Sequence, residues 1–117
     1  MSESKTEIVE KKEDKKMIYK VTPKYYGELD AENRTIKYKI ELPGVESSGV
    51  ELKVLPELWH LVAKRYENNH EVNYVLTKYF TYEVDPDSID AKFTNGLLNF
   101  TIKLKDPLAE AVDITLD

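Results

Sequence analysis

Two histidines and one group of aspartates are the residues in this sequence whose types could do chemistry. His60 and His70 are the only histidines, and either could act as a general base or a metal ligand. A protein metal site of the zinc type needs at least three converging ligands, and the chain contains no cysteine to supply them. His60 lies between apolar residues in an expected strand, and His70 lies in a polar turn. We therefore expect no catalytic residue, no metal site and no cofactor.

Aspartates recur at a spacing that could suit Ca²⁺. Asp85, Asp87 and Asp90 are not accompanied by the glycine and the distal glutamate of a calcium-binding loop. Aspartate is also a common turn residue, because its side chain bonds the backbone two residues later. We expect a turn at this position. The glycines of the chain are isolated from one another, so they indicate turns rather than a phosphate-binding loop.

Composition limits the classes of partner. The chain has 117 residues, 41% of them hydrophobic and 33% charged, which suits one globular domain. Its net charge of −5 opposes a general affinity for nucleic acid, which needs concentrated Lys and Arg. No apolar run is long enough to span a bilayer, and the first residues do not resemble a signal peptide. We expect neither nucleic acid nor a membrane as partner, and the absence of cysteine favours the cytosol.

A hairpin over residues 89–104 is the strongest structural signal. Apolar and polar residues alternate on both sides of Asn95-Gly96, a dipeptide that favours a tight turn because both residues tolerate positive φ. We expect Gly96 at positive φ. The side chains of this hairpin that we expect in the core are those of Ala91, Leu98 and Phe100. No residue here could do chemistry, so we expect the centre of the molecule to serve the packing of the core.

Strand patterns recur about every ten residues through the rest of the chain. The expected strands before the hairpin cover residues 17–21, 35–42, 50–54, 58–65 and 72–80. Tyr25-Tyr26-Gly27 is expected to lead into a turn at residues 30–33. Short strands at this spacing, with turn residues between them, are typical of an all-β sandwich of antiparallel strands.

The first sixteen residues form a separate, polar segment. Residues 1–16 hold five lysines, five acidic residues and few sizeable apolar side chains. Such a segment cannot bury enough apolar area to offset its ordering entropy. We expect a disordered, solubilising tail, with a docking arm as the alternative. The sandwich itself is expected over residues 17–107.

The last ten residues, 108–117, carry a strand pattern that has no partner left in the sequence. Val112, Ile114 and Leu116 alternate with polar residues. Pro107 ends the last core strand, because proline cannot donate a ladder hydrogen bond. A short strand with one apolar face is suited to adding to a groove or a sheet edge. An ordinary final strand on its own domain is the second interpretation.

Four motifs occur here in the same order as in the small heat-shock proteins, the α-crystallin family. They resemble that family's Leu-Pro-Gly-Val turn, its fifth strand (residues 58–65 here), its signature of alanine followed five residues later by Gly-x-Leu, and its Ile-x-Ile tail. The positions that carry the turn and the signature are Leu42, Pro43, Gly44, Val45, Ala91, Asn95, Gly96 and Leu98. Val112 and Ile114 carry the tail motif.

This resemblance implies both a fold and a function. The implied fold is an immunoglobulin-like β-sandwich of two antiparallel sheets. The implied function is that of a stress-response chaperone, an ATP-independent holdase that binds partly unfolded client proteins and prevents their aggregation. It also implies that Val112 and Ile114 dock in an apolar groove, either on a neighbouring subunit of a homo-oligomer or on their own domain.

Several features depart from the α-crystallin pattern. Lys78 stands where an arginine is usual, and an ammonium group does not reproduce a guanidinium fork. The Leu-Pro that usually follows this strand is absent after Phe80. Only residues 66–71 connect two strands that many members join by a long exchanged loop, so we expect a tight hairpin and no strand-swapped dimer through it. Residues 1–16 are too polar to resemble the usual client-binding arm.

These departures bring the chain closer to the related CS-domain co-chaperones. Such domains share the sandwich and act as adaptors of ATP-driven chaperones. The alternative function is therefore an adaptor with little holdase activity. A monomer or small dimer is favoured over a large assembly.

Overall fold

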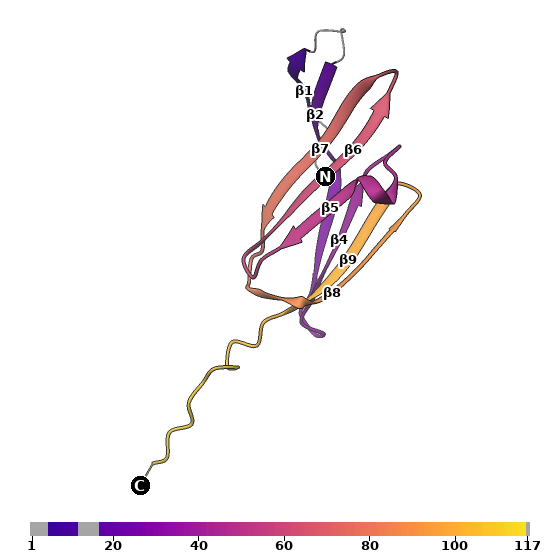
Figure 1. The fold of residues 1–117 in the computed structure, drawn as a ribbon. Coiled ribbons are helices and arrows are strands. Elements are labelled where there is room, and N and C mark those ends of the chain that lie inside the picture. The colour runs from indigo at the N-terminus through magenta and orange to yellow at the C-terminus, as the bar shows by residue number, and fades with distance from the viewer. Residues whose placement is uncertain (1–4, 12–16, 117) are drawn as a thin grey trace.

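Residues 5–11 and 17–116 are described by the computed structural model of this protein, and in these ranges the regular secondary structure is β-strand apart from one short 3₁₀ turn (Figure 1). The elements are β1 (Lys5–Lys11), β2 (Met17–Thr22), β3 (Tyr25–Asp30), β4 (Thr35–Glu41), the 3₁₀ turn η1 (Ser47–Gly49), β5 (Val50–Val54), β6 (Leu58–Glu67), β7 (His70–Tyr79), β8 (Val84–Thr94) and β9 (Leu97–Leu104). Within the same ranges no helix has the length and apolar content needed to cross a bilayer.

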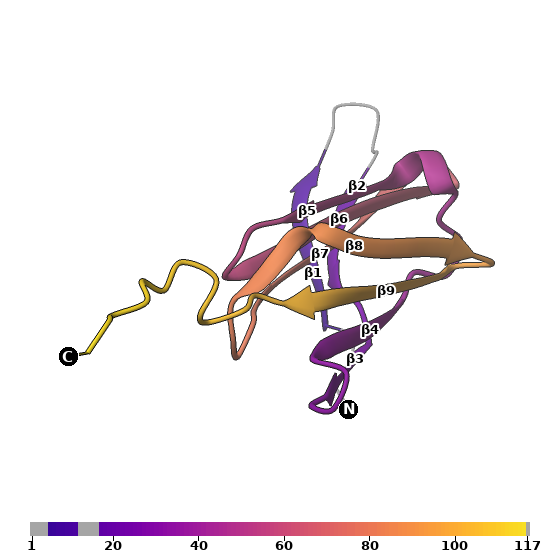
Figure 2. The same ribbon diagram turned by 90° about the horizontal axis from the view of Figure 1, so that it is seen from below.

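The strands form two sheets that pack face to face (Figure 2). One sheet has the order β1-β2-β7-β6-β5 and the other has the order β3-β4-β9-β8. The predicted all-β sandwich of immunoglobulin type is confirmed. One detail differs from a pair of purely antiparallel sheets, because β2 runs parallel to β7. These two strands are far apart in sequence, so no tight turn constrains their direction.

The core lies between the inner faces of the two sheets. Successive side chains of a strand point to opposite faces, and the alternating apolar positions of the central strands are the buried ones. The buried apolar side chains are Ile36, Ile40, Leu42, Val45, Trp59, Leu61, Ala63, Val72, Tyr74, Phe80, Val84, Leu98, Phe100 and Ile102. The predicted burial of Leu98 and Phe100 is therefore confirmed.

The prediction that Ala91 is buried is wrong. Ala91 pairs with Phe100 across the β8–β9 ladder, but its own side chain is exposed. β8 is an outer strand, so Ala91 has a neighbouring strand on one side only. A methyl group at that position is also too short to reach the facing sheet.

Two tight turns shape the hairpins. Asn95 and Gly96 both have positive φ, 50° and 76°, which confirms the predicted turn between β8 and β9. Asn68 and Asn69 have φ of 50° and 67° and connect β6 to β7, with Glu67 paired to His70. The tight hairpin predicted for residues 66–71 is thus present. Positive φ at both central residues suits the twist of a two-residue hairpin loop.

Two strands were not expected from the sequence. Tyr25–Asp30 forms β3, where a lead into a turn is predicted, because β4 offers a free edge and the ring of Tyr38 fills the space beside Gly27. Lys5–Lys11 forms β1, antiparallel to β2, where the sequence predicts a disordered tail. Backbone hydrogen bonds to β2 stabilise this segment, although its sequence contains few apolar residues. Residues 1–4 and 12–16 of that predicted tail lie outside the described residues.

Candidate functional site

The motif residues from the sequence meet at one end of the sandwich, where they hold two turns together. The Leu42 amide donates a hydrogen bond of 2.7 Å to the Gly96 carbonyl oxygen. A Cβ atom on Gly96 would lie 3.1 Å from the Leu42 carbonyl oxygen. The loop after β4 and the turn next to Asn95 are therefore in close backbone contact. This contact is a packing constraint and presents no group to a ligand.

The rest of the Leu42–Val45 turn packs on the β6–β7 hairpin. Gly44 has φ of 79°, and a Cβ atom there would lie 2.9 Å from Cδ of Arg65. The Tyr74 hydroxyl donates to the Pro43 carbonyl oxygen at 3.4 Å, and Arg65 Nε donates to the same hydroxyl at 3.4 Å. Hydrogen bonds to Tyr74 and to Glu67 raise the pKa of Arg65. The guanidinium therefore stays charged and supports the turn from outside.

The residues that could do chemistry have structural contacts instead. His60 Nδ1 lies 2.6 Å from the Thr77 hydroxyl, and His70 Nδ1 accepts a hydrogen bond of 3.1 Å from the Met17 amide. The Asp85 carboxylate accepts from the Asp87 amide at 3.0 Å, as expected of a turn. In the part of the chain that the structure describes, no three His, Asp or Glu side chains gather as metal ligands.

Lys78, at the position of the usual arginine, joins the two sheets. It lies on β7 of one sheet, and its Nζ atom is 5.0 Å from the centre of the Tyr25 ring on β3 of the other. An ammonium group over an aromatic face is a favourable cation–π contact. Tyr25 in turn meets the Trp59 ring edge-on, with 6.4 Å between ring centres. Lys78 thus helps to hold β3 on the sandwich.

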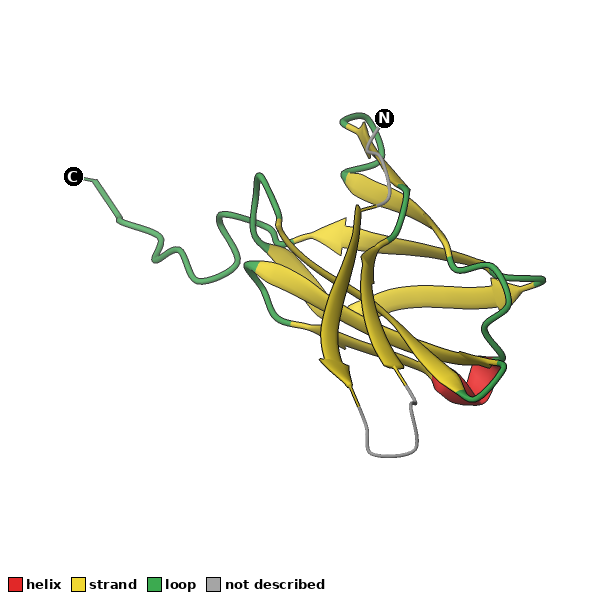
Figure 3. Ribbon diagram, turned by 90° about the horizontal axis from the view of Figure 1, so that it is seen from above, coloured by secondary structure: helices red, strands yellow, loops and turns green. Residues whose placement is uncertain are grey.

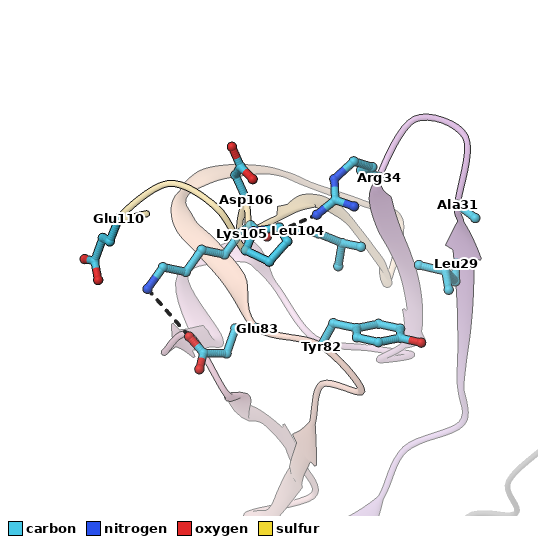
Figure 4. Close-up of a pocket in the computed structure, with 10 residues that line it drawn as sticks. Leu29, Ala31, Arg34, Tyr82, Glu83, Leu104, Lys105, Asp106 and Glu110 are labelled. Atoms are coloured by element: carbon cyan, nitrogen blue, oxygen red, sulfur yellow. Dashed lines mark hydrogen bonds and ion pairs between the residues drawn. The ribbon is translucent and has the colours of Figure 1, made fainter. Parts of the chain in front are cut away.

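A groove of about 680 Å³, shown in Figure 4, is lined by residues at the end of the sandwich opposite to the motif turns. Its walls come from the β3–β4 hairpin, the loop between β7 and β8, the end of β9 and the start of the C-terminal tail. The lining residues are Leu29, Ala31, Arg34, Tyr82, Glu83, Leu104, Lys105, Asp106, Pro107 and Glu110.

The groove exists because the sandwich is open at this end. Leu29 and Leu104 occupy core-side positions at the ends of their strands. Leu104 is partly buried against the core, whereas Leu29 is largely uncovered. Leu29 is 48% exposed and Tyr82, on the loop, is 57% exposed. Figure 4 shows both side chains directed toward the opening, with Leu104 between the two walls. The groove therefore has apolar walls that water reaches.

Charged residues form the rim of the groove. Arg34 donates a hydrogen bond of 3.1 Å to the Lys105 carbonyl oxygen, and the Lys105 ammonium group lies 3.7 Å from a Glu83 carboxylate oxygen. On the β3–β4 hairpin, Asp30 closes the turn by accepting hydrogen bonds from the side chain and the backbone of Asn33, at 2.8 and 3.1 Å. These bonds lower the pKa of Asp30. The hairpin wall is therefore held by an ionised carboxylate.

The C-terminal tail begins at the groove and leaves the sandwich (Figure 1). Two successive turns follow Pro107, with hydrogen bonds from the Ala109 amide to Asp106 and from the Ala111 amide to Leu108. Val112, Ile114 and Leu116 are 80%, 74% and 87% exposed. They do not form a final strand on their own domain, so that interpretation of the tail does not hold in this structure.

The groove residues were missed by the sequence analysis. Leu29 lies in β3, where the sequence predicts the approach to a turn, and Tyr82 lies in a loop without a motif. A usable signal was the alternation of Tyr25, Gly27 and Leu29 with polar residues. Gly27 obscured it, because glycine is uncommon in strands.

One protein-family model matches the sequence over most of its length. Residues 14–105 match the PIH1 CS-like domain. No protein of curated function matches the sequence.

Solved structures with a similar fold are small heat-shock proteins, which confirms the predicted resemblance at the level of the fold. Heat shock protein 16.0 from Schizosaccharomyces pombe has a TM-score of 0.63 at 19% identity, over 82% of this chain and 76% of that chain. HspA from Xanthomonas axonopodis has a TM-score of 0.62 at 16% identity, over 72% and 94%. A small heat-shock protein from Xylella fastidiosa has a TM-score of 0.62 at 14% identity, over 82% and 96%.

Fold and family together support a chaperone-type role. The sandwich is that of the α-crystallin type, whereas the sequence itself matches a CS-like model from a position just before β2 to the end of β9. That match covers well over half of the residues, and the chain therefore belongs to the PIH1 CS-like domain family.

Proposed function

We propose that this protein is a co-chaperone-type adaptor, which binds extended segments of partner proteins at its groove end and through its C-terminal tail. The observation that carries the proposal is the distribution of exposed apolar side chains. An adaptor needs a small, defined apolar site, whereas a holdase needs broad apolar surface for clients of many shapes.

Among the described residues, exposed large apolar side chains are spread thinly over the sandwich and follow closely on one another along the short tail. Among the described residues, those on the sandwich are Tyr26, Leu29, Leu55, Tyr66, Tyr79 and Tyr82. Four of these six are tyrosines, whose hydroxyl groups remain compatible with water. Four more exposed apolar residues, starting with Leu108, follow one another along the tail. Most of the sandwich surface thus offers little to an unfolded chain.

The groove has the features of a peptide site. Its apolar walls, made by Leu29, Tyr82 and Leu104, could accept an apolar side chain, and its charged rim could orient a backbone. The tail provides a second element, since an apolar stripe on an extended segment can add to a groove or a sheet edge of a partner. Neither element needs a cofactor or a catalytic group, so the adaptor acts by binding alone.

An ATP-independent holdase is the second candidate, and the fold itself favours it. The sandwich resembles those of small heat-shock proteins, and its outer strands offer backbone groups that could capture misfolding clients. Under this candidate the partners are partly unfolded client proteins. The polar character of the sandwich surface outside the groove end argues against broad client capacity.

Two assays on the full chain separate the candidates. Light scattering of a heat-aggregating protein measures holdase activity, and retention of a purified ATP-driven chaperone on the immobilised chain measures adaptor activity. We expect little suppression of scattering at equimolar ratio, together with retention of the chaperone. Strong suppression without retention would establish the holdase and refute the adaptor.

Matched variants locate the binding surface. Tyr82→Asp places a charge in the groove, Ile114→Asp places one on the tail, and Tyr66→Asp places one on an exposed tyrosine of the β6–β7 hairpin, at the opposite end. We expect the first two to reduce retention at least tenfold, about the effect of losing 1.4 kcal/mol of binding free energy. Tyr66→Asp should bind as the parent does. Equal losses in all three variants would show that the groove end is not the site.

A further inference from the structure

The outer edge of β3 carries unpaired backbone groups in a defined pattern. β3 is the last strand of its sheet, with β4 on one side only. The Glu41 amide donates to the Lys24 carbonyl oxygen at 2.9 Å, so Lys24 and Glu41 are a hydrogen-bonded pair of the β3–β4 ladder. Hydrogen-bonded pairs alternate along an antiparallel ladder. Tyr25, Gly27 and Leu29 therefore direct their N–H and C=O groups away from β4, toward the free edge.

The sequence of this edge is complementary to itself when it is read in the opposite direction. Residues 24–30 are Lys-Tyr-Tyr-Gly-Glu-Leu-Asp, with Gly27 at the centre. Reversal about Gly27 sets Lys24 opposite Asp30, Tyr25 opposite Leu29 and Tyr26 opposite Glu28. The first pair joins opposite charges, and the second joins two apolar side chains. Both kinds of cross-strand pair stabilise antiparallel strands.

From these two observations we infer that β3 pairs with β3 of a second copy of this chain, antiparallel and with Gly27 on the two-fold axis. In this register Tyr25 of one copy lies opposite Leu29 of the other, and the two Gly27 residues lie opposite each other. These are the residues whose N–H and C=O groups face the free edge, so they can form the hydrogen-bonded pairs of the new ladder. Tyr25, Gly27 and Leu29 of each copy supply three donors and three acceptors. We call this β3–β3 contact the seam. It satisfies the backbone groups of an edge to which other strands could otherwise add.

Side chains on both faces of the joined sheet fit this register. On the outer face each Lys24 ammonium group meets the Asp30 carboxylate of the other copy, and the bonds from Asn33 keep that carboxylate ionised and in place. On the core side each Tyr25 ring lies beside Leu29 of the other copy, which is 48% exposed in the single chain. At the axis Gly27 has no side chain, so the two backbones can approach without a clash.

The other outer strands are less suited to such a seam. β1 and β8 both have irregular registers, between Ile8 and Glu10 and between Asp85 and Asp90, which interrupt their edges. β5 has only five residues and carries the Lys53–Glu51 ion pair, 3.3 Å, within its own strand. Pairing through β3 joins the two four-stranded sheets into one and leaves the two tails at opposite ends. A dimer of this kind presents two C-terminal tails, so it is bivalent toward a partner with repeated tail-binding sites. The inference goes beyond the adaptor function and does not depend on it.

Sedimentation velocity of the full chain tests the inference, because the seam makes association depend on concentration. We expect a monomer–dimer equilibrium without larger species, since the pairing is closed by the two-fold axis. A parent that stays monomeric at millimolar concentration would overturn the inference. It would leave the adaptor proposal untouched, because that proposal needs one chain only.

Charge reversal tests the register. Lys24→Glu places a glutamate opposite Asp30 of the other copy, and Asp30→Lys places a lysine opposite Lys24 of the other copy. Because of the two-fold axis, each homodimer then contains two pairs of like charge. Each variant should raise the dimer dissociation constant roughly tenfold, because surface charge pairs are worth up to about 1 kcal/mol each. In an equal mixture of the two variants both charge pairs are restored, so a heterodimer should form at the parent's concentration.

Two controls guard the interpretation. Lys53→Glu makes the same charge change on β5 and should leave the parent equilibrium unchanged. Circular dichroism establishes that Asp30→Lys, which also loses the bonds to Asn33, remains folded. If either variant dimerises as the parent does, or if the mixture forms no heterodimer, the proposed register is wrong.

Discussion

The two outer strands of the four-stranded sheet, β8 and β3, meet solvent in different ways. Figure 3 shows the sandwich with its strands in yellow and the connecting turns in green. On β8, residues 86–89 lie opposite Ile102 alone, because the register shifts between Asp85 and Asp90. The Ser88 hydroxyl donates to the Asp85 carbonyl oxygen at 2.7 Å and accepts from the Lys103 amide at 2.8 Å. A side chain thus replaces part of the ladder, and the edge that remains is interrupted.

β3 has none of these features. Its six residues pair with β4 without a register shift, and its free edge stays regular. Outer strands are commonly protected from pairing by bulges, charges or short length. The interrupted register of β8 protects its edge, whereas the regular edge of β3 leaves its backbone groups available to another strand. β4 and β9 lie between these two edges, so the contrast between the edges can be tested first at β9.

The largest effect is expected on β9, which lies between β4 and β8. Leu98 is 3% exposed, and Leu98→Ala should lower the free energy of unfolding by roughly 2–5 kcal/mol, through lost burial and a cavity. Urea denaturation measures the change, with Asn99→Ala on the other face of the strand as control. Equal midpoints for the two variants would mean that β9 is not the centre of the sheet.

A second effect is expected at the turn that connects β8 to β9. Gly96 has φ of 76°, and a Cβ atom there would lie 3.1 Å from the Leu42 carbonyl oxygen. Gly96→Val should therefore cost about 1–3 kcal/mol of stability, because a β-branched residue is strained at positive φ. Thermal unfolding followed by circular dichroism measures it. A variant that melts with the parent would refute the assignment of this turn.

Ser88→Ala should remove the side-chain link in the β8 bulge at a smaller cost. The Lys103 amide loses its acceptor, so we expect a loss of about 1 kcal/mol and faster hydrogen exchange at that amide. Ser48→Ala, in the 3₁₀ turn, is the control. Unchanged hydrogen exchange at the Lys103 amide would show that the bulge does not depend on Ser88. The proposed difference between the β8 and β3 edges would then be refuted.

The smallest effect is expected at the β3–β4 turn and depends on pH. Hydrogen bonds from Asn33 lower the pKa of Asp30 from its usual value of 3.8. A carboxyl group whose pKa is lowered on folding stabilises the fold above its unfolded pKa, and this contribution is lost as the pH falls through the folded value. Asn33→Ala should therefore destabilise the chain at pH 6 and have less effect at pH 2. A difference that grows in acid would contradict this account.

Much of the fold could be predicted because alternation along a strand reports directly which face is buried. The strand at 35–42, the strand at 58–65 and the Asn95-Gly96 turn each needed only their own residues, since hydrophobic period and turn chemistry are local. The motif positions Leu42 to Val45 could be recognised for the same reason. Their role could not, because the contact between Leu42 and Gly96 joins segments more than fifty residues apart.

The sequence by itself determined an all-β sandwich, its turns and the apolar stripe of the tail. Only the tertiary structure decided that Ala91 is exposed, that Lys5–Lys11 joins a sheet, and that the groove opens beside Leu29. Each of these depends on which strands lie at an edge and where the facing sheet ends. Strand order is set by pairing between distant segments, and no periodicity within a strand encodes its neighbours.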